Sequence, residues 1–562
     1  MRFETTTRPL RELVRAFHRG EILLPQFQRD YVWRPAKIRN LLDSLLRGFP
    51  IGGFYLWRPT SGAIDPKKKA YGQASISAEF GGYLIDGPQR LTSLEAAFGL
   101  YTGEDRSGAE LRCFLDLYAK GDEPHRDTRL FVTYAGKKSV ARRVDRGDAT
   151  LVDLSLIFDG QDYDLRKSTE QALELLPGWT SQEVLAAMTR FDNACVMLDQ
   201  QVPCTTIHEV SDTDAVEVFS RLNKGGTALR QGDVRAAELA RGDSVDVLKQ
   251  MREFVSQERP RRLGFGFSFA FRALVVFHRG SAQFRALKPD WMDAPGPDRR
   301  SLAQSWHATK KGLEAALSFA DEHLGWSRRA LVPSSNALIV LAFAFDKADF
   351  KSTQDADQDY RRWLCLTALR NVFQGSVETT INRFIRGVSE SRRHPAAALV
   401  QSLKRAEGAR IRSEEFNSRS QPWGPATQVI LAWLVSRGAK DWLTGAAIDS
   451  LARAGSASLP TGDLTVHQIF SRKVLADVEY DPDDANIAAN YALLSRPTNS
   501  EFSNRQPDEV LAALKPDERQ QAETQFFGVA AGDLLSKERH YDFLKWRAER
   551  LADSINEFLG FS

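Results

Sequence analysis

Four short segments of this 562-residue chain gather side chains that could bind a phosphate or a metal ion. Three of them cluster polar side chains around glycine or proline: LPQFQRDYVW from Leu24, IDGPQR from Ile85 and FSRLNKGGT from Phe219. The fourth is LTVHQIFSRKVL from Leu464, which a series of asparagines follows. Packing alone does not require so many polar groups at these places, so each segment is a candidate site.

The IDGPQR segment follows a short apolar run and precedes a helical pattern, which predicts a strand–turn–helix corner. A helix that starts there presents its first N–H groups to a phosphate, while Arg90 and Arg29 neutralise charge and Asp86 is available to hold Mg²⁺. The alternative interpretation is local. Asp86 as N-cap and Gln89 three residues later would form a capping box, with a proline in the first turn. The residues alone leave both interpretations open.

His467 is the histidine of the fourth segment, and taken alone it would be assigned a structural role. Its neighbours suggest more. Asn490 precedes an apolar YALL run, and Asn499 follows one or two helical turns later. This arrangement makes His467 a candidate functional residue.

The periodicity of apolar residues predicts the elements that position these segments. A helix is expected over 36–48, where five apolar residues form one helical stripe. Strands are expected over 53–57, 83–85, 111–117, 129–134 and 205–210, with a loop over 61–80 and a helix over 214–222. The first 240 residues therefore mix helices and strands.

From residue 240 to 460 the pattern is helical, with hardly any alternating segment. Helical stretches are expected at 363–372 and 429–434, and the most apolar run, 337–345, is expected to be a buried helix. An amphipathic helix is expected within 534–558, and His540 in it is assigned to the surface or to packing. This part of the chain is interpreted as a helical spacer followed by a small C-terminal domain.

Composition bounds the function. Hydrophobic residues make up 42% and charged residues 27% of the chain, which is ordinary for a folded globular protein and excludes disorder. The 76 Lys and Arg against 73 Asp and Glu give a net charge of +3, too small for an indiscriminate nucleic-acid binder. Any DNA contact must come from local basic patches, and three are candidates: 259–262, 392–394 and 404–412.

The four cysteines form no CxxC pair, so neither a disulfide framework nor a zinc ribbon is expected. The N-terminus lacks the apolar core of a signal peptide, and no uninterrupted apolar stretch is long enough for a membrane span. We therefore expect a cytoplasmic protein without membrane contact.

Taken together and in this order, PQFQRDYVW, DGPQR and NKGGTAL resemble the hallmarks of the domain of unknown function number 262, the GmrS half of GmrSD restriction enzymes. The resemblance implies a ParB/sulfiredoxin-like fold that binds, and in some members hydrolyses, a nucleoside triphosphate while sensing modified DNA. It implies a nucleotide pocket lined by Gln28, Arg29, Asp86, Gly87, Gln89 and Arg90. Pro88 departs from the pattern, since it stands where the family has a glutamine and removes one backbone N–H. That change would weaken nucleotide binding or hydrolysis if the position touches the nucleotide.

The segment from His467 onward resembles the ββα-metal fold of HNH nucleases, in the version fused behind a GmrS-like domain, with the pattern H-H-I-F-P, N-x-x-L-L, then N. In such sites one Mg²⁺ or Mn²⁺ neutralises the scissile phosphate, a histidine deprotonates the attacking water, and an asparagine orients that histidine. The resemblance implies that Asn490 positions the hairpin and that His467 and Asn499 bind the metal, with Asn504 as the substitute if the register shifts.

The first part of this motif departs from the family pattern. Aligned on Ile469-Phe470, His467 falls in the metal-ligand position and Gln468 in that of the general base, while a serine replaces the usual proline. A glutamine cannot accept a proton near neutral pH. Either His467 itself serves as the catalytic base, with Val466 leaving a ligand position to water, or the domain cuts poorly and mainly binds DNA.

The sequence therefore predicts an α+β chain in three parts: a ParB/sulfiredoxin-like sensing domain over 1–240, an α-helical middle over 241–420 and a ββα-metal, HNH-like domain over 421–562. The expected function is a nucleotide-regulated DNA endonuclease of a restriction or antiphage system, acting on modified phage DNA with Mg²⁺ or Mn²⁺ and a nucleoside triphosphate as cofactors. Partner proteins of the same defence system are also candidates. The alternative is a non-enzymatic DNA-binding or regulatory subunit that works with a partner nuclease. A phosphodiesterase acting on RNA would use the same residues.

Overall fold

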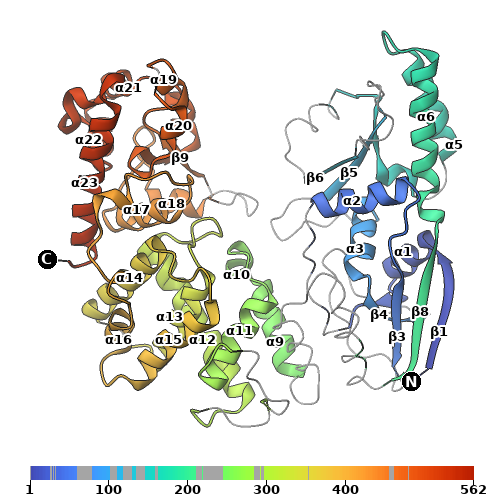
Figure 1. Cartoon of the computed structure of the whole chain (residues 1–562), viewed down its shortest axis with the longest axis horizontal. Coiled ribbons are helices and arrows are strands. Elements are labelled where there is room, and N and C mark those ends of the chain that lie inside the picture. Colours follow the sequence, from blue (N-terminus) through green and yellow to red (C-terminus); the bar gives the residue numbers. More distant parts are fainter. Residues whose placement is uncertain are drawn as a thin grey trace. The chain divides into compact units, whose positions relative to one another are not determined.

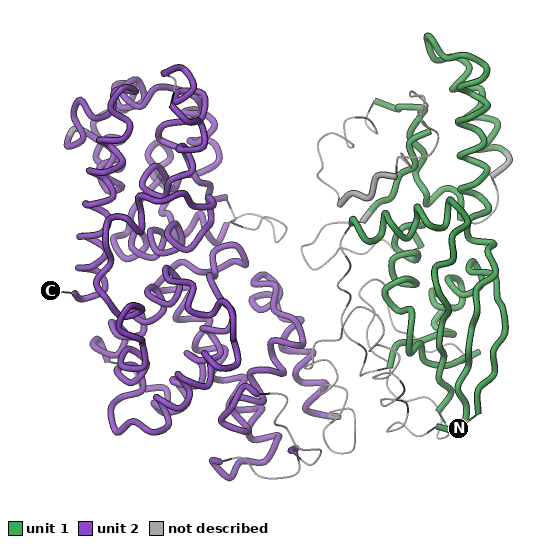
Figure 2. Tube along the Cα trace, viewed as in Figure 1, with its two compact units in different colours: residues 1–245 green, residues 246–562 purple. Residues whose placement is uncertain are grey.

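The computed structural model describes most of the chain, in the following residues: 2–25, 28, 31, 33, 35–59, 79–100, 111–117, 130–134, 143, 146–158, 162–210, 215, 218, 245–283, 291–292, 297–351, 353–454, 461, 463–478 and 480–561. The chain divides into two compact units, residues 1–245 and 246–562 (Figure 2). The further separation of a helical middle from a C-terminal domain at residue 420 stays a prediction.

The N-terminal unit is built on a five-stranded mixed sheet in the order β1-β8-β3-β4-β2 (Figure 1). The strands are β1 (Arg2–Pro9), β2 (Ile22–Leu23), β3 (Phe54–Pro59), β4 (Gly82–Asp86) and β8 (Gln201–Val210). β1 and β8 are antiparallel, as are β3 and β4, whereas β3 with β8 and β2 with β4 are parallel. The expected strands over 53–57, 83–85 and 205–210 are thus confirmed, the last within a longer strand.

The inner strands β3 and β4 contribute to apolar clusters on both faces of this sheet, since side chains alternate along a strand. In β4, Leu84 belongs to the larger core cluster, while Tyr83 and Ile85 belong to a smaller cluster with Trp57 of β3. The larger cluster takes residues from helices as well, among them α1 (Leu10–His18), α2 (Pro35–Leu46) and α3 (Pro88–Ala97). The helix expected over 36–48 corresponds to α2, whose stripe is buried as predicted.

A second, three-stranded antiparallel sheet in the order β6-β5-β7 completes this unit. Its strands are β5 (Leu111–Asp116), β6 (Leu130–Tyr134) and β7 (Leu151–Asp153). Helices α5 (Asp162–Glu174) and α6 (Ser181–Val196) follow it in the chain and lie side by side (Figure 1). The strands expected over 111–117 and 129–134 are confirmed. The expected loop over 61–80 falls almost entirely outside the described residues, as does most of the helix expected over 214–222.

The first part of the C-terminal unit is helical, as predicted. Its helices are α9 (Val245–Ser256), α10 (Glu258–Arg262), α11 (Phe267–Arg279), α12 (Leu302–Leu324), α13 (Ser335–Lys347), α14 (Gln354–Leu369), α15 (Val377–Glu390), α16 (Pro395–Gln401), α17 (Pro425–Ser436) and α18 (Ile448–Arg453). All nine residues of the apolar run 337–345 are buried in α13, which confirms the expected buried helix. None of the described helices combines the length and the apolar character needed to cross a bilayer.

The last hundred residues form a small arrangement of two antiparallel strands and short helices. The elements are β9 (Leu464–Gln468), α19 (Arg472–Ala476), β10 (Tyr491–Ser495), α20 (Arg496–Phe502), α21 (Pro507–Ala513), α22 (Pro516–Glu523) and α23 (His540–Phe558). The order of β9, β10 and α20 is strand, strand, helix, and α20 starts directly where β10 ends. The terminal helix begins at His540, because residues 529–539 before it form 3₁₀ turns.

Candidate active site and nucleotide corner

The corner between β4 and α3 depends on Gly87, which is the N-cap residue of α3 and has a left-handed backbone with φ 98°. No described side chain caps this helix, so the capping box predicted for Asp86 and Gln89 is wrong. A Cβ at Gly87 would lie 2.3 Å from Cδ1 of Phe54. The left-handed turn brings the start of α3 close to β3, and only glycine fits there.

Arg90 holds this corner together from the first turn of α3. Its Nη1 donates to the carbonyl of Ile51, and its Nη2 donates to the carbonyl of Gly53 at 2.8 Å and to Asp86 Oδ2 at 3.1 Å. The guanidinium also lies over the Phe54 ring, 4.6 Å from its centroid. Burial lowers the pKa of Arg90, and the Asp86 carboxylate partly opposes this shift. The guanidinium of Arg90 is therefore bound to backbone carbonyls before β3 and to Asp86. The sequence predicted a phosphate as its partner and did not predict these contacts.

Gln28 connects the PQFQRDYVW segment to the same corner. It is buried, and its Nε2 donates to the carbonyls of Leu84, at 3.1 Å, and Ile85, at 2.5 Å. Tyr31 Oη and Ser93 Oγ of α3 are 2.9 Å apart and share a second hydrogen bond between the two segments. The structure thus brings together the first two sequence segments singled out above. Arg29 and the NKGGTAL segment lie outside the described residues, and Gln89 is 6% exposed.

We predict that Gly87→Ala destabilises the N-terminal unit by about 3 kcal/mol, because it combines a left-handed backbone with overlap against Phe54. Hydrogen exchange of the β4 amides measures the loss. Gly48→Ala is the matched control, since Gly48 also has a positive φ, +71°, but no described atom lies near its missing Cβ. The control should lose only about 1 kcal/mol, and equal losses in both variants would contradict the packing argument.

In the C-terminal unit, His467 and Asn499 meet as the sequence predicts. His467 is on β9 and Asn499 is on α20, and their Nδ1 and Oδ1 atoms are 2.9 Å apart. His467 is 5% exposed, and this burial lowers its pKa to about 4, with the Asn499 hydrogen bond opposing the shift. The imidazole is therefore neutral at neutral pH and keeps one nitrogen lone pair. Asn504 lies beyond the end of α20 in an exposed, left-handed position with φ 63°.

Asn490 is fully buried just before β10 and uses its side chain to fix the segment that leaves β9. Its Oδ1 accepts from the N–H of Phe470 at 2.9 Å, and its Nδ2 donates to the carbonyls of Phe470 and Ala485 at 2.8 and 3.0 Å. These are the contacts that a hairpin-positioning role requires. Asn490 therefore shapes the site without facing it.

Three buried residues that sequence reasoning missed support the same hairpin and helix. Asp441 accepts from Ser495 N at 2.7 Å and from Thr498 Oγ1 at 2.6 Å, which fixes the start of α20. Gln525 pairs through both side-chain atoms with the backbone of Leu493 in β10, at 2.9 Å each. The third is Arg547 of α23. The partners of Asp441 and Gln525 in β10 and α20 are more than 30 residues away in the chain, so no local pattern could have revealed these contacts.

Arg547 is 1% exposed and donates to the carbonyl of Ala489 at 2.5 Å and twice to that of Gln525, at 2.9 and 3.1 Å. Burial lowers its pKa to about 9. Because Ala489 precedes Asn490, this guanidinium connects the terminal helix to the segment that carries Asn490. The amphipathic helix predicted at the chain end thus has a positioning role as well as an apolar face.

His540 is buried at the start of α23, so of the two places expected for it, packing is correct and the surface is not. Its ring lies 4.9 Å from the Phe470 ring and 5.3 Å from that of Tyr541. Neither ring nitrogen has a hydrogen-bond partner among the described residues. Burial lowers its pKa to about 4, and the charge of Asp484 partly opposes the shift.

This burial makes the C-terminal unit sensitive to acid. The pKa of His540 in the folded protein lies below its value of about 6.5 in the unfolded chain, so between these values the unfolded chain binds a proton that the folded protein does not. The free energy of unfolding is therefore unaffected above pH 6.5 and decreases as the pH falls toward 4. We predict that His540→Phe, which keeps the ring contacts, reduces the stability lost between pH 7 and 4 by up to about 3 kcal/mol. Urea unfolding at the two pH values measures this, and an unchanged acid dependence would contradict it.

The metal-ligand chemistry of the site is sparse. The described residues include no group of three or more His, Cys, Asp and Glu side chains that could hold an ion. His467 and Asn499 nevertheless offer a neutral imidazole and an amide oxygen. In the hydrogen-bonded pair Nδ1 donates its proton to Asn499 Oδ1, so an ion that took both atoms as ligands would replace that proton, with the imidazole protonated on Nε2 instead. The pair fits an ion that keeps several waters, as Mg²⁺ does.

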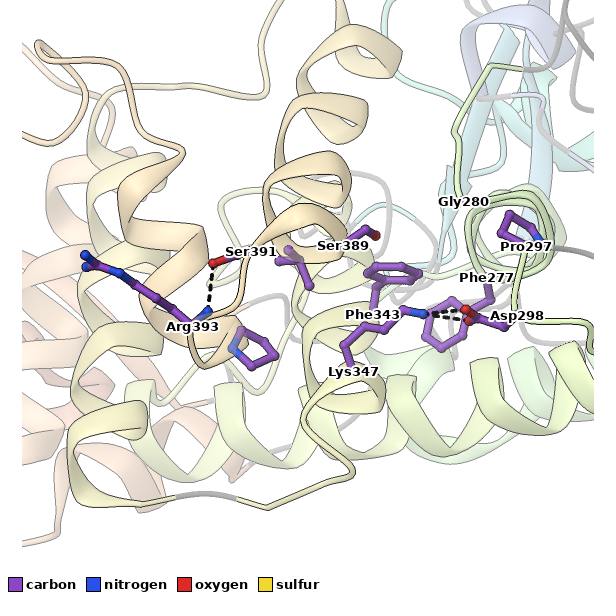
Figure 3. A pocket seen from close by; sticks show the side chains of 11 residues that line it. Phe277, Gly280, Pro297, Asp298, Phe343, Lys347, Ser389, Ser391 and Arg393 are labelled. Carbon is purple, nitrogen blue, oxygen red and sulfur yellow. Dashed lines mark hydrogen bonds and ion pairs between the residues drawn. The ribbon is translucent and has the colours of Figure 1, made fainter.

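A separate pocket of about 360 Å³ lies among α11, α13 and α15 (Figure 3). Phe277 and Phe343 line it, and Lys347 Nζ contacts both carboxylate oxygens of Asp298 at 2.7 and 2.8 Å. Arg393 also lines the pocket, so its charged side chains are two basic ones and one acidic one, of which Lys347 and Asp298 are paired with each other.

Comparisons with known proteins bear on the N-terminal unit. Residues 10–240 match the family model of the GmrSD restriction endonuclease, N-terminal domain. A stretch of 105 residues is also 33% identical to the uncharacterized protein MJ0686 of Methanocaldococcus jannaschii, and it covers 17% of this chain and 17% of that protein. The resemblance to the GmrSD type is thus confirmed for the first 240 residues. The match ends there, and the HNH-like assignment of the C-terminal region stays a prediction.

Proposed function

Because residues 10–240 match the N-terminal domain of a GmrSD restriction endonuclease, we propose that this chain is a DNA endonuclease of a restriction or defence system. We assign phosphodiester cleavage to the β9–β10–α20 arrangement of the C-terminal unit. The observation that carries this assignment is the approach of His467 Nδ1 and Asn499 Oδ1 to 2.9 Å from two different elements.

Each residue of the arrangement has a distinct role in the proposal. His467 and Asn499 would hold one Mg²⁺ or Mn²⁺, and Asn490 and Asp441 keep the hairpin and α20 in register. When bound, the ion would neutralise charge on the scissile phosphate. A neutral imidazole is the form that can donate a lone pair, and its burial keeps His467 in that form down to about pH 4.

The same burial makes His467 a poor general base, because a group with a pKa of about 4 does not hold a proton at neutral pH. Gln468, the next residue, cannot accept a proton at all. Gln468 is only partly buried, and its Nε2 donates to Asn486 Oδ1 at 3.0 Å. We therefore propose slow cleavage, limited by proton removal from the attacking water.

Gln468→His should accelerate cleavage at least tenfold, because a positioned base contributes about 10²- to 10⁴-fold and Asn486 would orient the new imidazole. Initial rates of supercoiled plasmid nicking measure the gain, with Gln468→Ala as the control. No gain over that control would mean that the missing base does not limit the rate.

The function itself is tested by incubating the full-length protein with supercoiled plasmid in Mg²⁺ or Mn²⁺, with and without EDTA, on DNA with and without modified cytosines. The proposal expects nicking that EDTA abolishes. Nicking that persists in EDTA, or none in the wild type and in Gln468→His, would overturn it.

The second candidate is a non-enzymatic DNA-binding or regulatory subunit, and Gln468 in the base position is the observation that favours it. This candidate expects DNA binding without cleavage in every variant. Cleavage of an RNA substrate in place of DNA, in the same assay, would point to the third class raised by the sequence.

For the N-terminal unit we propose that the β4–α3 corner binds a nucleoside triphosphate that regulates cleavage. The start of α3, which no described side chain caps, supports this, because the first N–H groups of a helix favour phosphate oxygens. Asp86, whose side chain is 36% exposed, would hold the accompanying Mg²⁺. Calorimetric titration with ATP and GTP tests it, and binding that is unchanged in Asp86→Asn and in Gly87→Ala would contradict it.

A further inference from the structure

Three arginines from two segments of the C-terminal unit surround one carboxylate, that of Asp321 near the end of α12. Arg453 of α18 contacts it through Nε at 2.8 Å. Arg259 and Arg262 of α10 approach the other oxygen through Nη2 at 3.7 and 3.8 Å, which is longer than a hydrogen bond. The Asp321 side chain is 8% exposed. We call these three arginines with Asp321 the arginine cluster.

The charges of the arginine cluster are not balanced by its own carboxylate, since Asp321 can neutralise only one of the three guanidinium groups. Two further arginines are exposed close to cluster members in the chain or the structure: Arg261 precedes Arg262 in α10, and the side chain of Arg329 covers Gly264, two residues after Arg262. The acidic groups nearby include Asp449, which bonds Arg453, and Asp463, whose charge raises the pKa of Arg328. Glu258 in α10 and Glu322 in α12 are exposed. Among the described residues of this surface, arginine therefore remains in excess.

A sixth arginine lies beneath this surface. Arg328 is 2% exposed and donates to the carbonyls of Ala452, Arg453 and Ala454, at 3.0, 2.8 and 2.7 Å. Its pKa is lowered by burial and then by the neighbouring positive charge of Arg262. Arg328 thus fixes the end of α18 beneath the arginine cluster.

The arginine cluster is fixed on folded elements. Arg259 Nη1 donates to Ser318 Oγ at 2.8 Å, and Arg262 Nε donates to the carbonyl of Ser327 at 3.0 Å. These contacts hold the stems and leave the two Nη2 atoms near Asp321. Such a preorganised set of forks binds an oxyanion with less loss of side-chain freedom than solvated arginines would.

The arginine cluster is also connected to the proposed nuclease elements within the same compact unit. Asp463, which precedes β9, donates its N–H to the carbonyl of Leu451 in α18 at 3.0 Å. The N–H of Arg496, the first residue of α20, donates to the carbonyl of Asp463 at 3.2 Å. Backbone hydrogen bonds therefore join α18 to both the hairpin and the helix that carries Asn499.

We propose that the arginine cluster, with Arg261 and Arg329, binds the phosphodiester backbone of duplex DNA and holds it for the β9–β10–α20 site. The identity of the polyanion rests on the proposed function. The surface itself rests on the excess of arginine over carboxylate. Guanidinium groups match the geometry of phosphate oxygens, and such contacts recognise the backbone without reading its sequence.

The test measures binding of a fluorescein-labelled 30-base-pair duplex to the full-length protein by anisotropy, in EDTA so that cleavage does not interfere. The variant is the double substitution Arg259→Gln and Arg261→Gln. The matched control is Arg386→Gln with Arg550→Gln, which removes two charges from exposed positions on α15 and α23. Circular dichroism melting verifies that both variants are folded.

We expect the Kd of the cluster variant to rise about tenfold at 0.1 M salt, and the slope of log K against log salt to fall by about 2, one for each lost phosphate contact. The control should change less than twofold. Equal Kd values for the duplex in the two variants would overturn the proposal. It would also be overturned if the cluster variant bound duplex DNA like the wild type but no longer bound vesicles containing phosphatidylserine. A third outcome separates the two proposals. If the cluster variant binds duplex DNA more weakly but the wild-type protein shows no cleavage, this surface is supported and the nuclease assignment is rejected.

Discussion

We expect His467→Ala to lower the rate of metal-dependent plasmid nicking at least about 100-fold. The substitution removes one of the two proposed ligands and releases Asn499 from its 2.9 Å contact. The loss should be measured both in the wild-type background and in Gln468→His, where the rate is higher. Asn499→Ala should lose about as much, and the double variant no more than either alone, because the two residues act as a unit.

His467 is buried, so a cavity at this position could also affect folding. His467→Gln keeps most of the volume and separates the two effects. His307→Ala removes an exposed histidine from α12 and is the matched control, with no expected change in rate. A His467→Ala protein that is folded and nicks at the wild-type rate would contradict the proposed role.

We expect Asp441→Asn to lower the stability of the β9–β10–α20 arrangement by about 3 kcal/mol, because a buried charge-assisted network loses one acceptor. Asp441 accepts hydrogen bonds from Ser495 N at 2.7 Å and from Thr498 Oγ1 at 2.6 Å. An asparagine at this position would turn its N–H₂ group, a donor, toward one of these two donors. Hydrogen bonds from these groups hold the pKa of Asp441 below its ordinary value although burial opposes this. Hydrogen exchange of the β10 amides measures the loss.

The nicking rate of Asp441→Asn should fall as well, since Asp441 fixes the start of the helix that carries Asn499. Asp477→Asn is the control, because Asp477 is exposed and lies beyond α19. A loss below about 1 kcal/mol in Asp441→Asn would show that the network tolerates an unpaired donor and would remove its positioning role.

The parts of the fold predictable from sequence are those with strong local patterns. The stripe of α2 and the uniform apolar run of α13 are local, and both were predicted. By contrast, β1 carries the polar sequence RFETTTRP, is exposed on both faces, and exists because it pairs with β8 two hundred residues away. No periodicity reports such a pairing.

The candidate site shows the same division. The pairing of His467 with Asn499 was implied by the resemblance to HNH nucleases, and the structure places the two side chains next to each other. Arg90 was assigned to a phosphate from its place in DGPQR, but its donors reach the carbonyls of Ile51 and Gly53. Asp441 carried no motif, and only the tertiary structure reveals its contact with α20.

The central claim is that His467 and Asn499 share one divalent ion. Titration of the full-length protein with Mn²⁺, followed by the loss of the free-ion electron paramagnetic resonance signal, tests it without any catalytic readout. The account predicts one weak site in the wild type that is absent from both His467→Ala and Asn499→Ala and is retained in Gln468→Ala. Equal Mn²⁺ stoichiometry and affinity in the wild type and the first two variants would contradict it.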